Sequence, residues 1–185
     1  PFSISLGPAH ARSHVGSCGW PARDDVKVKL LNAQQGVGEI GIQAPNLASR
    51  YWPDLPITDD DGWFHSGDLA RQEPDSSYWV VGRAKDMLIS GGENIYPAEI
   101  ENLLAAQACV AECAVLGLPD EQWGEVVAAC VVLQSGTDTA IAQEALSAAL
   151  SGQIARYKLP RKWFFISELP KTALGKVQKP QLLAR

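Results

Sequence analysis

Residues 82–101 read GRAKDMLISGGENIYPAEIE, and this stretch divides the chain into two halves of different character. The consecutive glycines Gly91 and Gly92 favour a tight turn that another chain or a ligand can approach closely. Pro97 opens a run with apolar residues at helical spacing, which predicts a helix with proline in its first turn. We expect a break between two structural units near residues 83–86, just before this turn and helix.

The half before the break carries the patterns of β-structure. Apolar and polar residues alternate over 26–30 and 37–42, which predicts half-buried strands. An aromatic and β-branched run at 78–81 predicts a third strand, and the acidic stretch 59–62, which ends in glycine, predicts a turn. We therefore expect residues 1–84 to form a β-rich unit.

Strands and helices alternate in the half after the break. The valine-rich run 126–133 predicts a buried strand, apolar spacing predicts a helix over 139–153, and 162–166 predicts another strand. The stretch 169–179, which contains proline, glycine and several lysines, is expected to be a mobile loop. Residues 85–185 should therefore form a small α/β unit, so the fold class of the chain is α+β or α/β.

The composition narrows the range of functions. The 185 residues are 46% hydrophobic with a formal net charge of −5, which supports a folded core and argues against nucleic acid as a partner. No apolar run approaches the roughly 20 residues that span a bilayer, so no transmembrane segment is expected. The four cysteines form no C-x-x-C pair and no secretory signal is visible, so we expect a cytoplasmic protein with reduced thiols. Because the first residue is Pro1 and not methionine, we expect the chain to be a piece of a longer protein.

Two familiar patterns do not fit their surroundings. Residues 36–41 match G-x-G-x-x-G, but Pro45 disfavours the helix that a dinucleotide site needs, so a glycine-rich hairpin is the better interpretation. His10, His14 and Cys18 have helical spacing, but glycines interrupt that helix and no fourth ligand is near, so no metal site is expected. The sequence contains neither a G-x-x-x-x-G-K-[ST] phosphate loop nor a G-x-S-x-G nucleophile turn.

Three segments suggest chemistry because they occur together and in order. GWFHSGD at 62–68 ends in Asp68, a carboxylate that can accept two hydrogen bonds from a vicinal diol such as ribose. Within residues 82–101, Arg83 can reach a sugar or a phosphate. LPKTALGKVQK at 169–179 places Lys176 after a glycine, from where its charge can reach a phosphoryl centre. Taken alone, Asp68 is explained by an ordinary turn and Lys176 by a solvated lysine, whereas residues 82–101 are too long and specific to be explained by a hairpin turn and a helix cap.

Together these segments resemble the last signature motifs of the adenylate-forming (AMP-binding) superfamily of acyl-CoA synthetases, peptide-synthetase adenylation domains and luciferases. The resemblance covers nearly the whole chain. It implies that residues 1–84 are the C-terminal end of a large AMP-binding domain and that residues 85–185 are the small mobile C-terminal domain of such enzymes.

The resemblance also implies roles for individual residues. Asp68 and Arg83 resemble nucleotide-binding residues that hold the ribose of ATP, and Lys85 lies at the hinge about which the small domain turns. Lys176 resembles the catalytic lysine that binds the acid and the α-phosphate during adenylation. The residues expected to bind coenzyme A (CoA) in the thioester step are Gly91, Gly92, Tyr157, Lys158 and Arg161.

The implied protein is an ATP-dependent acid–CoA ligase, which forms acyl-AMP from a carboxylic acid and ATP and then acyl-CoA. The sequence GGENIYP at 91–97 resembles the corresponding motif of acyl- and aryl-CoA ligases, which favours CoA as the acceptor. The family's phosphate loop, acid pocket and magnesium-associated glutamate have no counterpart here, so ATP with magnesium requires an upstream N-terminal domain and the chain alone should be inactive. Two alternatives stay open: an adenylation domain that loads a carrier protein, and a non-catalytic binding module.

Overall fold

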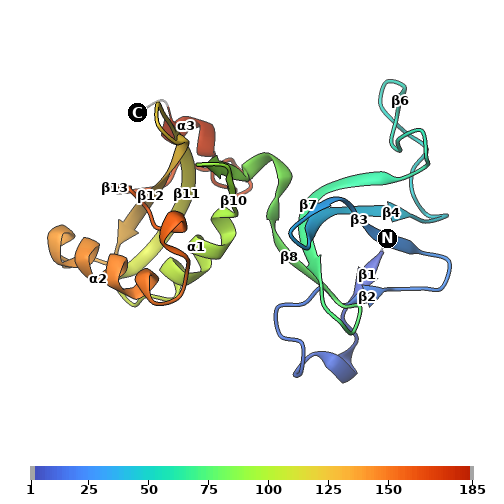
Figure 1. Ribbon diagram of the computed structural model, residues 1–185, viewed down its shortest axis with the longest axis horizontal. Coiled ribbons are helices and arrows are strands. Elements are labelled where there is room, and N and C mark those ends of the chain that lie inside the picture. Colours follow the sequence, from blue (N-terminus) through green and yellow to red (C-terminus); the bar gives the residue numbers. More distant parts are fainter. Residues whose placement is uncertain (1–2, 184–185) are drawn as a thin grey trace. The chain divides into compact units, whose positions relative to one another are not determined.

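The computed structural model describes residues 3–183, and the chain divides into two compact units with the boundary between Lys85 and Asp86. The first unit is rich in strands and the second mixes strands with helices (Figure 1). The mixed α/β character expected from the sequence is therefore confirmed. Within the described residues no helix is long and apolar enough to cross a bilayer.

The first unit is built on a four-stranded antiparallel sheet in the order β3-β4-β7-β8. Its strands are β3 (Lys27–Gln34), β4 (Val37–Gln43), β7 (Phe64–Gln72) and β8 (Tyr78–Arg83). Smaller elements flank this sheet: η1 (Pro8–His10), β1 (Ile4–Ser5) paired with β2 (Trp20–Pro21), and β5 (Arg50–Tyr51) paired with β6 (Leu55–Pro56).

The G-x-G-x-x-G stretch lies in the β3–β4 hairpin. The interpretation of this stretch as a glycine-rich hairpin is therefore confirmed. Gln35 and Gly36 form the turn with φ values of +50° and +81°, a geometry that suits two-residue hairpins. Behind the turn, Ile40 and Ile42 of β4 are buried and pack in the core of this unit with Val26. The glycines of this stretch therefore serve a hairpin.

Strand β7 is the main departure from the prediction for this unit. The sequence predicts a turn at GWFHSGD, but only its beginning is a turn, and Phe64 opens a strand that lies between β4 and β8. Asp59 Oδ1 closes the turn by accepting hydrogen bonds from the backbone N–H groups of Asp61 and Trp63. The strand is hard to recognise because serine, glycine and aspartate are weak strand formers and its pairing with β4 is irregular.

The second unit holds a five-stranded sheet in the order β10-β9-β12-β11, with β13 parallel to β12 on the side away from β11. Its strands are β9 (Leu88–Ser90), β10 (Glu93–Ile95), β11 (Val110–Asp120), β12 (Gly124–Leu133) and β13 (Lys162–Phe165). Its helices are α1 (Pro97–Ala105), α2 (Thr139–Ser151) and α3 (Lys179–Leu183), with the short 3-10 turn η3 (Arg156–Lys158); a further 3-10 turn, η2 (Ala84–Asp86), spans the boundary between the units.

Two apolar clusters lie on this sheet. The larger one joins the sheet to α1 and α2 through Ile100, Leu104, Leu146 and Leu150, each at most 1% exposed. The smaller one consists of apolar side chains of β11 and β12 packed with Leu169, Val177 and Leu182 of the C-terminal segment. Both α1 and α2 lie where the sequence predicts them, and α2 begins after Asp138, whose carboxylate accepts hydrogen bonds from two backbone N–H groups of the first turn.

Strand β11 and helix α3 are missed by the sequence analysis. The β11 run contains alanine, cysteine, glycine and Pro119, which weaken the strand pattern, although it pairs with β12 along most of its length. Helix α3 has only five residues. Both elements are fixed by tertiary contacts more than by local sequence.

The stretch around Lys176 is a closed hairpin, where the sequence predicts a loop. Lys171 and Val177 pair as an isolated bridge, and the N–H groups of Thr172 and Gln178 donate to the carbonyls of Lys176 and Pro170 at 2.8 Å. Gly175 makes the turn with a φ of +79°. We refer to residues 170–178 as the Lys176 hairpin.

Candidate functional site

Asp68 and Arg83 stand opposite each other on the neighbouring strands β7 and β8. The distance between Arg83 Nε and Asp68 Oδ1 is 2.7 Å, and the two side chains are 53% and 33% exposed. The carboxylate accepts hydrogen bonds and the guanidinium donates them, so the exposed pair can bind a group that carries neighbouring hydroxyls. The structure thus brings together two residues that the sequence analysis assigns to one ligand.

Glu39 on β4 holds the backbone that precedes Asp68. Its Oε1 accepts a hydrogen bond of 2.7 Å from the N–H of Gly67, and its Oε2 lies 2.8 Å from His65 Nδ1. His65 Nε2 in turn lies 3.0 Å from Asp59 Oδ2. Glu39 was not predicted as a site residue, because its contact with the 62–68 segment depends on the pairing of β4 with β7.

The two carboxylates raise the pKa of His65 above its ordinary value of 6.5, Glu39 through the larger effect and Asp59 through the smaller. A raised pKa means that the stabilisation from the charged imidazole is complete below about pH 6.5 and is lost as the pH rises through the folded-state pKa. We predict that thermal unfolding of the first unit shifts to lower temperature as the pH rises above about 6.5. His65→Gln should remove most of this shift, and an equal shift in that variant would contradict the assignment.

His10, His14 and Cys18 do not converge on one point. The rings of His10 and His14 pack against Trp20 with centroids 4.9 and 5.0 Å from it. His14 Nε2 also lies 2.8 Å from an oxygen of Asp75, and Cys18 Sγ donates to a backbone carbonyl. Across residues 3–183, no group of three or more candidate ligands is arranged to hold a metal ion. The two histidines therefore form a structural cluster with Trp20, and Cys18 is not part of it.

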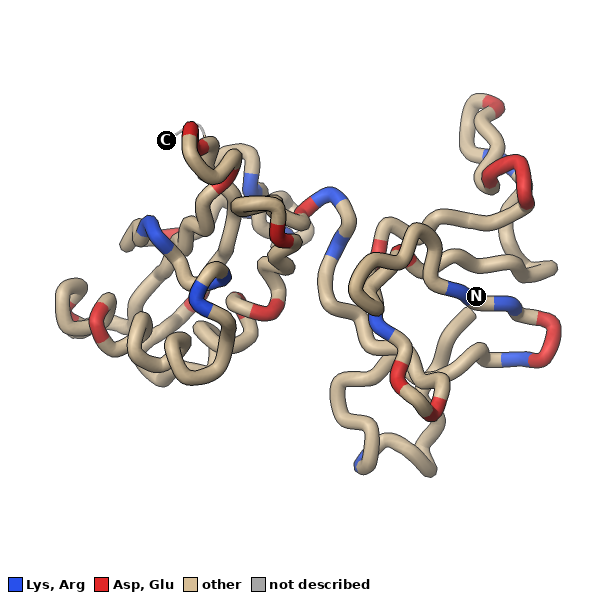
Figure 2. Tube along the Cα trace, viewed as in Figure 1, with Lys and Arg blue, Asp and Glu red and all other residues tan. Residues whose placement is uncertain are grey.

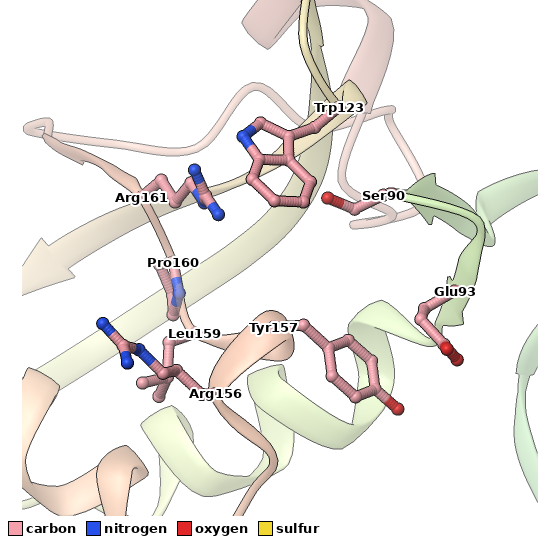
Figure 3. A pocket seen from close by; sticks show the side chains of 9 residues that line it. Ser90, Glu93, Trp123, Arg156, Tyr157, Leu159, Pro160 and Arg161 are labelled. Carbon is pink, nitrogen blue, oxygen red and sulfur yellow. The ribbon is translucent and has the colours of Figure 1, made fainter.

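A groove of about 840 Å³ opens on the second unit (Figure 3). One side is formed by the turn between β9 and β10, the other by the segment around η3, and Trp123 also lines it. Two guanidinium groups and two aromatic rings meet there, which suits a flat ligand that carries negative charge. The lining residues are Ser90, Gly91, Glu93, Trp123, Arg156, Tyr157, Leu159, Pro160 and Arg161.

Trp123 joins the glycine turn to the opposite side of the groove. Its carbonyl accepts a hydrogen bond of 2.9 Å from the N–H of Gly91, and the Arg161 guanidinium lies 4.5 Å from the centroid of its ring. Gly91 and Gly92 have φ values of +60° and +86°, as a two-residue hairpin turn requires. Trp123 was missed by the sequence analysis, because only the fold brings it next to this turn.

The residues expected to bind CoA divide into two groups. Gly91, Tyr157 and Arg161 line the groove, whereas Gly92 and Lys158 are not part of its lining. Lys158 Nζ lies 2.9 and 2.7 Å from the two carboxylate oxygens of Glu99 in the first turn of α1. This side chain is 18% exposed. Lys158 is therefore held in a partly exposed ion pair outside the lining of the groove.

The remaining predicted residues lie at the surface. Lys176 is exposed on its hairpin, where its backbone N–H donates to Thr172 Oγ1 at 3.2 Å. Lys85 is exposed in η2, at the boundary between the two units. Basic and acidic residues are interspersed along the trace (Figure 2), unlike the basic stripe of proteins that bind a nucleic-acid duplex.

Known proteins resemble this chain along its whole length. Residues 99–176 match the family described as the AMP-binding enzyme C-terminal domain. The chain is 46% identical to indoleacetate–CoA ligase of Aromatoleum aromaticum over 100% of this chain and 38% of the relative. It is 41% identical to feruloyl-CoA synthase of an Amycolatopsis species over 100% of this chain and 39% of the relative.

The comparison with solved structures also finds a CoA synthetase. The fold matches that of o-succinylbenzoate CoA synthetase from Bacillus subtilis in complex with its acyl-adenylate intermediate, with a TM-score of 0.88 and 31% identity. The match covers 98% of this chain and 38% of that structure. The chain therefore spans less than half the length of the proteins it resembles.

Proposed function

Because the chain belongs to the adenylate-forming superfamily, as a C-terminal portion related to acyl-CoA synthetases, we propose that it is part of an AMP-forming acid–CoA ligase. Residues 1–84 would then end the large AMP-binding domain, residues 85–185 would be the small domain, and Lys85 would be the hinge. The chain spans only 38% of the indoleacetate–CoA ligase it resembles. The phosphate loop, the acid pocket and the magnesium ligands would lie in a large domain outside this sequence, and the segment alone would be inactive.

In the first half-reaction, a carboxylate attacks the α-phosphorus of ATP, which gives acyl-AMP and pyrophosphate. Asp68 accepts hydrogen bonds from the ribose hydroxyls and Arg83 donates to the same sugar; the exposure of both side chains supports this role. Lys176 supplies a compact positive charge to the acid and α-phosphate oxygens, and its place on an exposed hairpin supports that reach. Glu39 keeps the backbone before Asp68 in place.

In the second half-reaction, the CoA thiolate attacks the acyl carbonyl and AMP leaves. The groove on the second unit is the observation that carries the choice of CoA over a carrier protein. CoA ends in a phosphorylated adenine nucleotide, whereas the arm of a carrier protein has no nucleotide. Arg156, Tyr157 and Arg161 offer the cationic and aromatic contacts that a nucleotide needs. The glycine turn at Gly91 lines the same groove, where the pantetheine arm would pass.

The native polypeptide that contains this segment provides the test. Pyrophosphate release from ATP would be measured against fatty, aryl and short carboxylic acids, with and without CoA. We expect release that depends on one class of acid and a CoA thioester as product. A thioester formed only on an added phosphopantetheinyl carrier protein would favour the alternative adenylation domain. If a folded full-length protein released no pyrophosphate with any of these acids, the remaining interpretation would be a non-catalytic binding module.

The ion pair between Lys158 and Glu99 leads to a prediction about the groove. We predict that Lys158 supports the segment around η3 through Glu99 and does not contact CoA. Lys158→Glu and Glu99→Lys should each weaken CoA binding by about fivefold, a magnitude expected for a partly exposed pair of about 1 kcal/mol. The double exchange should recover binding to within about twofold, because the pair forms again with reversed charges.

Isothermal titration of CoA into the 185-residue chain would measure these affinities. Arg161→Ala serves as the comparison, since its side chain lines the groove and no exchange of partner can restore it. If the double exchange stays as weak as Lys158→Glu alone, Lys158 is a ligand of CoA and the supporting role is wrong.

A further inference from the structure

The Lys176 hairpin is attached to the sheet of the second unit at both of its ends. Leu169, just before the hairpin, is 5% exposed and packs with Cys130 and other apolar side chains of β11 and β12. Val177 on the returning arm and Leu182 of α3 pack against the same cluster. Between these contacts the tip projects into solvent, with Leu174 87% exposed. The base of the hairpin is therefore fixed by packing, and its tip is exposed.

Two lysines, one on each side of Lys176, add polar attachments. Lys171 pairs with Glu112 of β11. Lys179 Nζ lies 2.9 Å from Glu101 Oε1 and donates a hydrogen bond of 2.9 Å to the carbonyl of Val115. The side chains of Lys179 and Glu101 are only 24% and 26% exposed, whereas those of the Lys171–Glu112 pair are 38% and 39% exposed. The Lys179 attachment is the better protected of the two, so it should be the stronger.

Lys179 and Glu101 together bind the backbone N–H and the backbone carbonyl of one residue, Val115, at the edge of the sheet. Strand β11 is the outer strand, with β12 on one side only. Val115 directs its backbone groups to the open side: its N–H donates to Glu101 Oε1 at 2.8 Å, and its carbonyl accepts from Lys179. An outer strand normally leaves such groups to water or to another strand. Here two side chains of opposite charge satisfy both groups and each other.

This arrangement fixes the backbone of Lys176 relative to β11. Lys171 lies five residues before Lys176 and Lys179 three residues after it, and the hydrogen bonds of the hairpin join the two arms between them. With its backbone held, the ammonium group of Lys176 moves only through its own side-chain torsions. A displacement of about 1 Å at a reacting group can lower a rate by about 10²-fold. The attachment of the hairpin should therefore affect the reaction at Lys176.

We propose that Lys179, acting with Glu101 and the backbone of Val115, is a positioning residue for Lys176. This inference rests on the proposed function, because it assumes that Lys176 acts in adenylation. Lys179 holds the hairpin and touches neither substrate nor nucleotide. Lys171 with Glu112 is a second, weaker attachment of the same hairpin.

The first test uses the 185-residue chain and does not depend on any activity. Heteronuclear ¹H–¹⁵N nuclear Overhauser effects would be measured for residues 173–176 in the wild type, Lys179→Met and Lys179→Arg. We expect values close to those of β11 in the wild type, a clear decrease in Lys179→Met, and recovery in Lys179→Arg, which keeps the charge. Unchanged values in a folded Lys179→Met variant would overturn the anchoring role.

The second test measures the two half-reactions separately in the full native protein. Lys179→Met should lower the rate of acyl-AMP formation by at least about tenfold, while the KM for ATP and thioester formation from supplied acyl-AMP stay within about threefold. Lys179→Arg should recover most of the lost rate. The matched control is Lys162→Met, which removes an exposed lysine of β13 outside the hairpin and should leave acyl-AMP formation unchanged.

The outcomes separate this inference from the proposed function. If both half-reactions fall equally in Lys179→Met, the residue supports general stability and the positioning role is wrong. If the wild type forms no acyl-AMP with any acid, the proposed function fails, and the relaxation measurement on the 185-residue chain still decides whether Lys179 holds the hairpin.

Discussion

Replacement of Lys176 by alanine in the full native protein should lower acyl-AMP formation by about 10²–10³-fold, the usual effect of removing one preorganised group that stabilises a transition state. Thioester formation from supplied acyl-AMP should stay within about threefold of the wild type. The reason is that the charge of Lys176 is proposed to act on the phosphoryl centre, which has already reacted when acyl-AMP is supplied. The exposed hairpin should also tolerate the change, because the Lys176 side chain is not part of either apolar cluster of its unit.

Quenched-flow measurement of each half-reaction would check this prediction. Lys176→Arg keeps the charge but changes its shape, and we expect only partial recovery of the rate, because the guanidinium is larger and planar. Equal losses in both half-reactions would show that Lys176 is not specific to adenylation.

Gly91→Ala should have the opposite selectivity. Gly91 has a φ of +60°, where an L-residue pays roughly 1–2 kcal/mol, and an added Cβ would lie 2.8 Å from the ring of Trp123. Relief of this clash requires the turn and Trp123 to move apart, which disturbs the contact of about 1 kcal/mol between Trp123 and Arg161. Because the turn lines the groove, we expect the CoA concentration for half-maximal thioester formation to rise by about thirtyfold, which corresponds to about 2 kcal/mol.

Gly92→Ala is the matched control for this prediction. Gly92 has a similar strained φ of +86°, but an added Cβ would meet nothing within 4 Å. Its effect on CoA use should therefore be several-fold smaller than that of Gly91→Ala, and acyl-AMP formation should stay within about threefold in both variants. Equal effects of the two changes would mean that backbone strain, and not the contact with Trp123, determines CoA use.

The elements with strong local patterns could be predicted from the sequence. The helix that begins at Pro97 and the valine-rich strand β12 both lie where the sequence predicts them, because their apolar spacing is clear and their burial is extensive. Strand β11 was missed, since its Pro119 and small residues mask the strand pattern and its stability comes from β12. Strand β7 was missed because the residues around Asp68 favour turns when considered alone.

The candidate site could be predicted only where a residue is recognisable within a motif. Asp68 and Arg83 were expected to share a ligand, and their direct pairing across β7 and β8 supports that expectation. Trp123 and Glu39 could not be found in this way, because each acts through a partner far away in the sequence. The same is true of Lys179, whose contact with Val115 spans 64 residues. The side chains that position the predicted residues are visible only after folding.

The measurement that tests the central claim most directly is a single-turnover reaction of the full native protein with ATP and the acid class that releases pyrophosphate. The products would be quenched and identified by mass spectrometry before and after CoA is added. An AMP-forming acid–CoA ligase should accumulate acyl-AMP before the addition and convert it to acyl-CoA and AMP afterwards. Formation of ADP with an acyl phosphate, or acyl-AMP that CoA does not consume, would contradict the account.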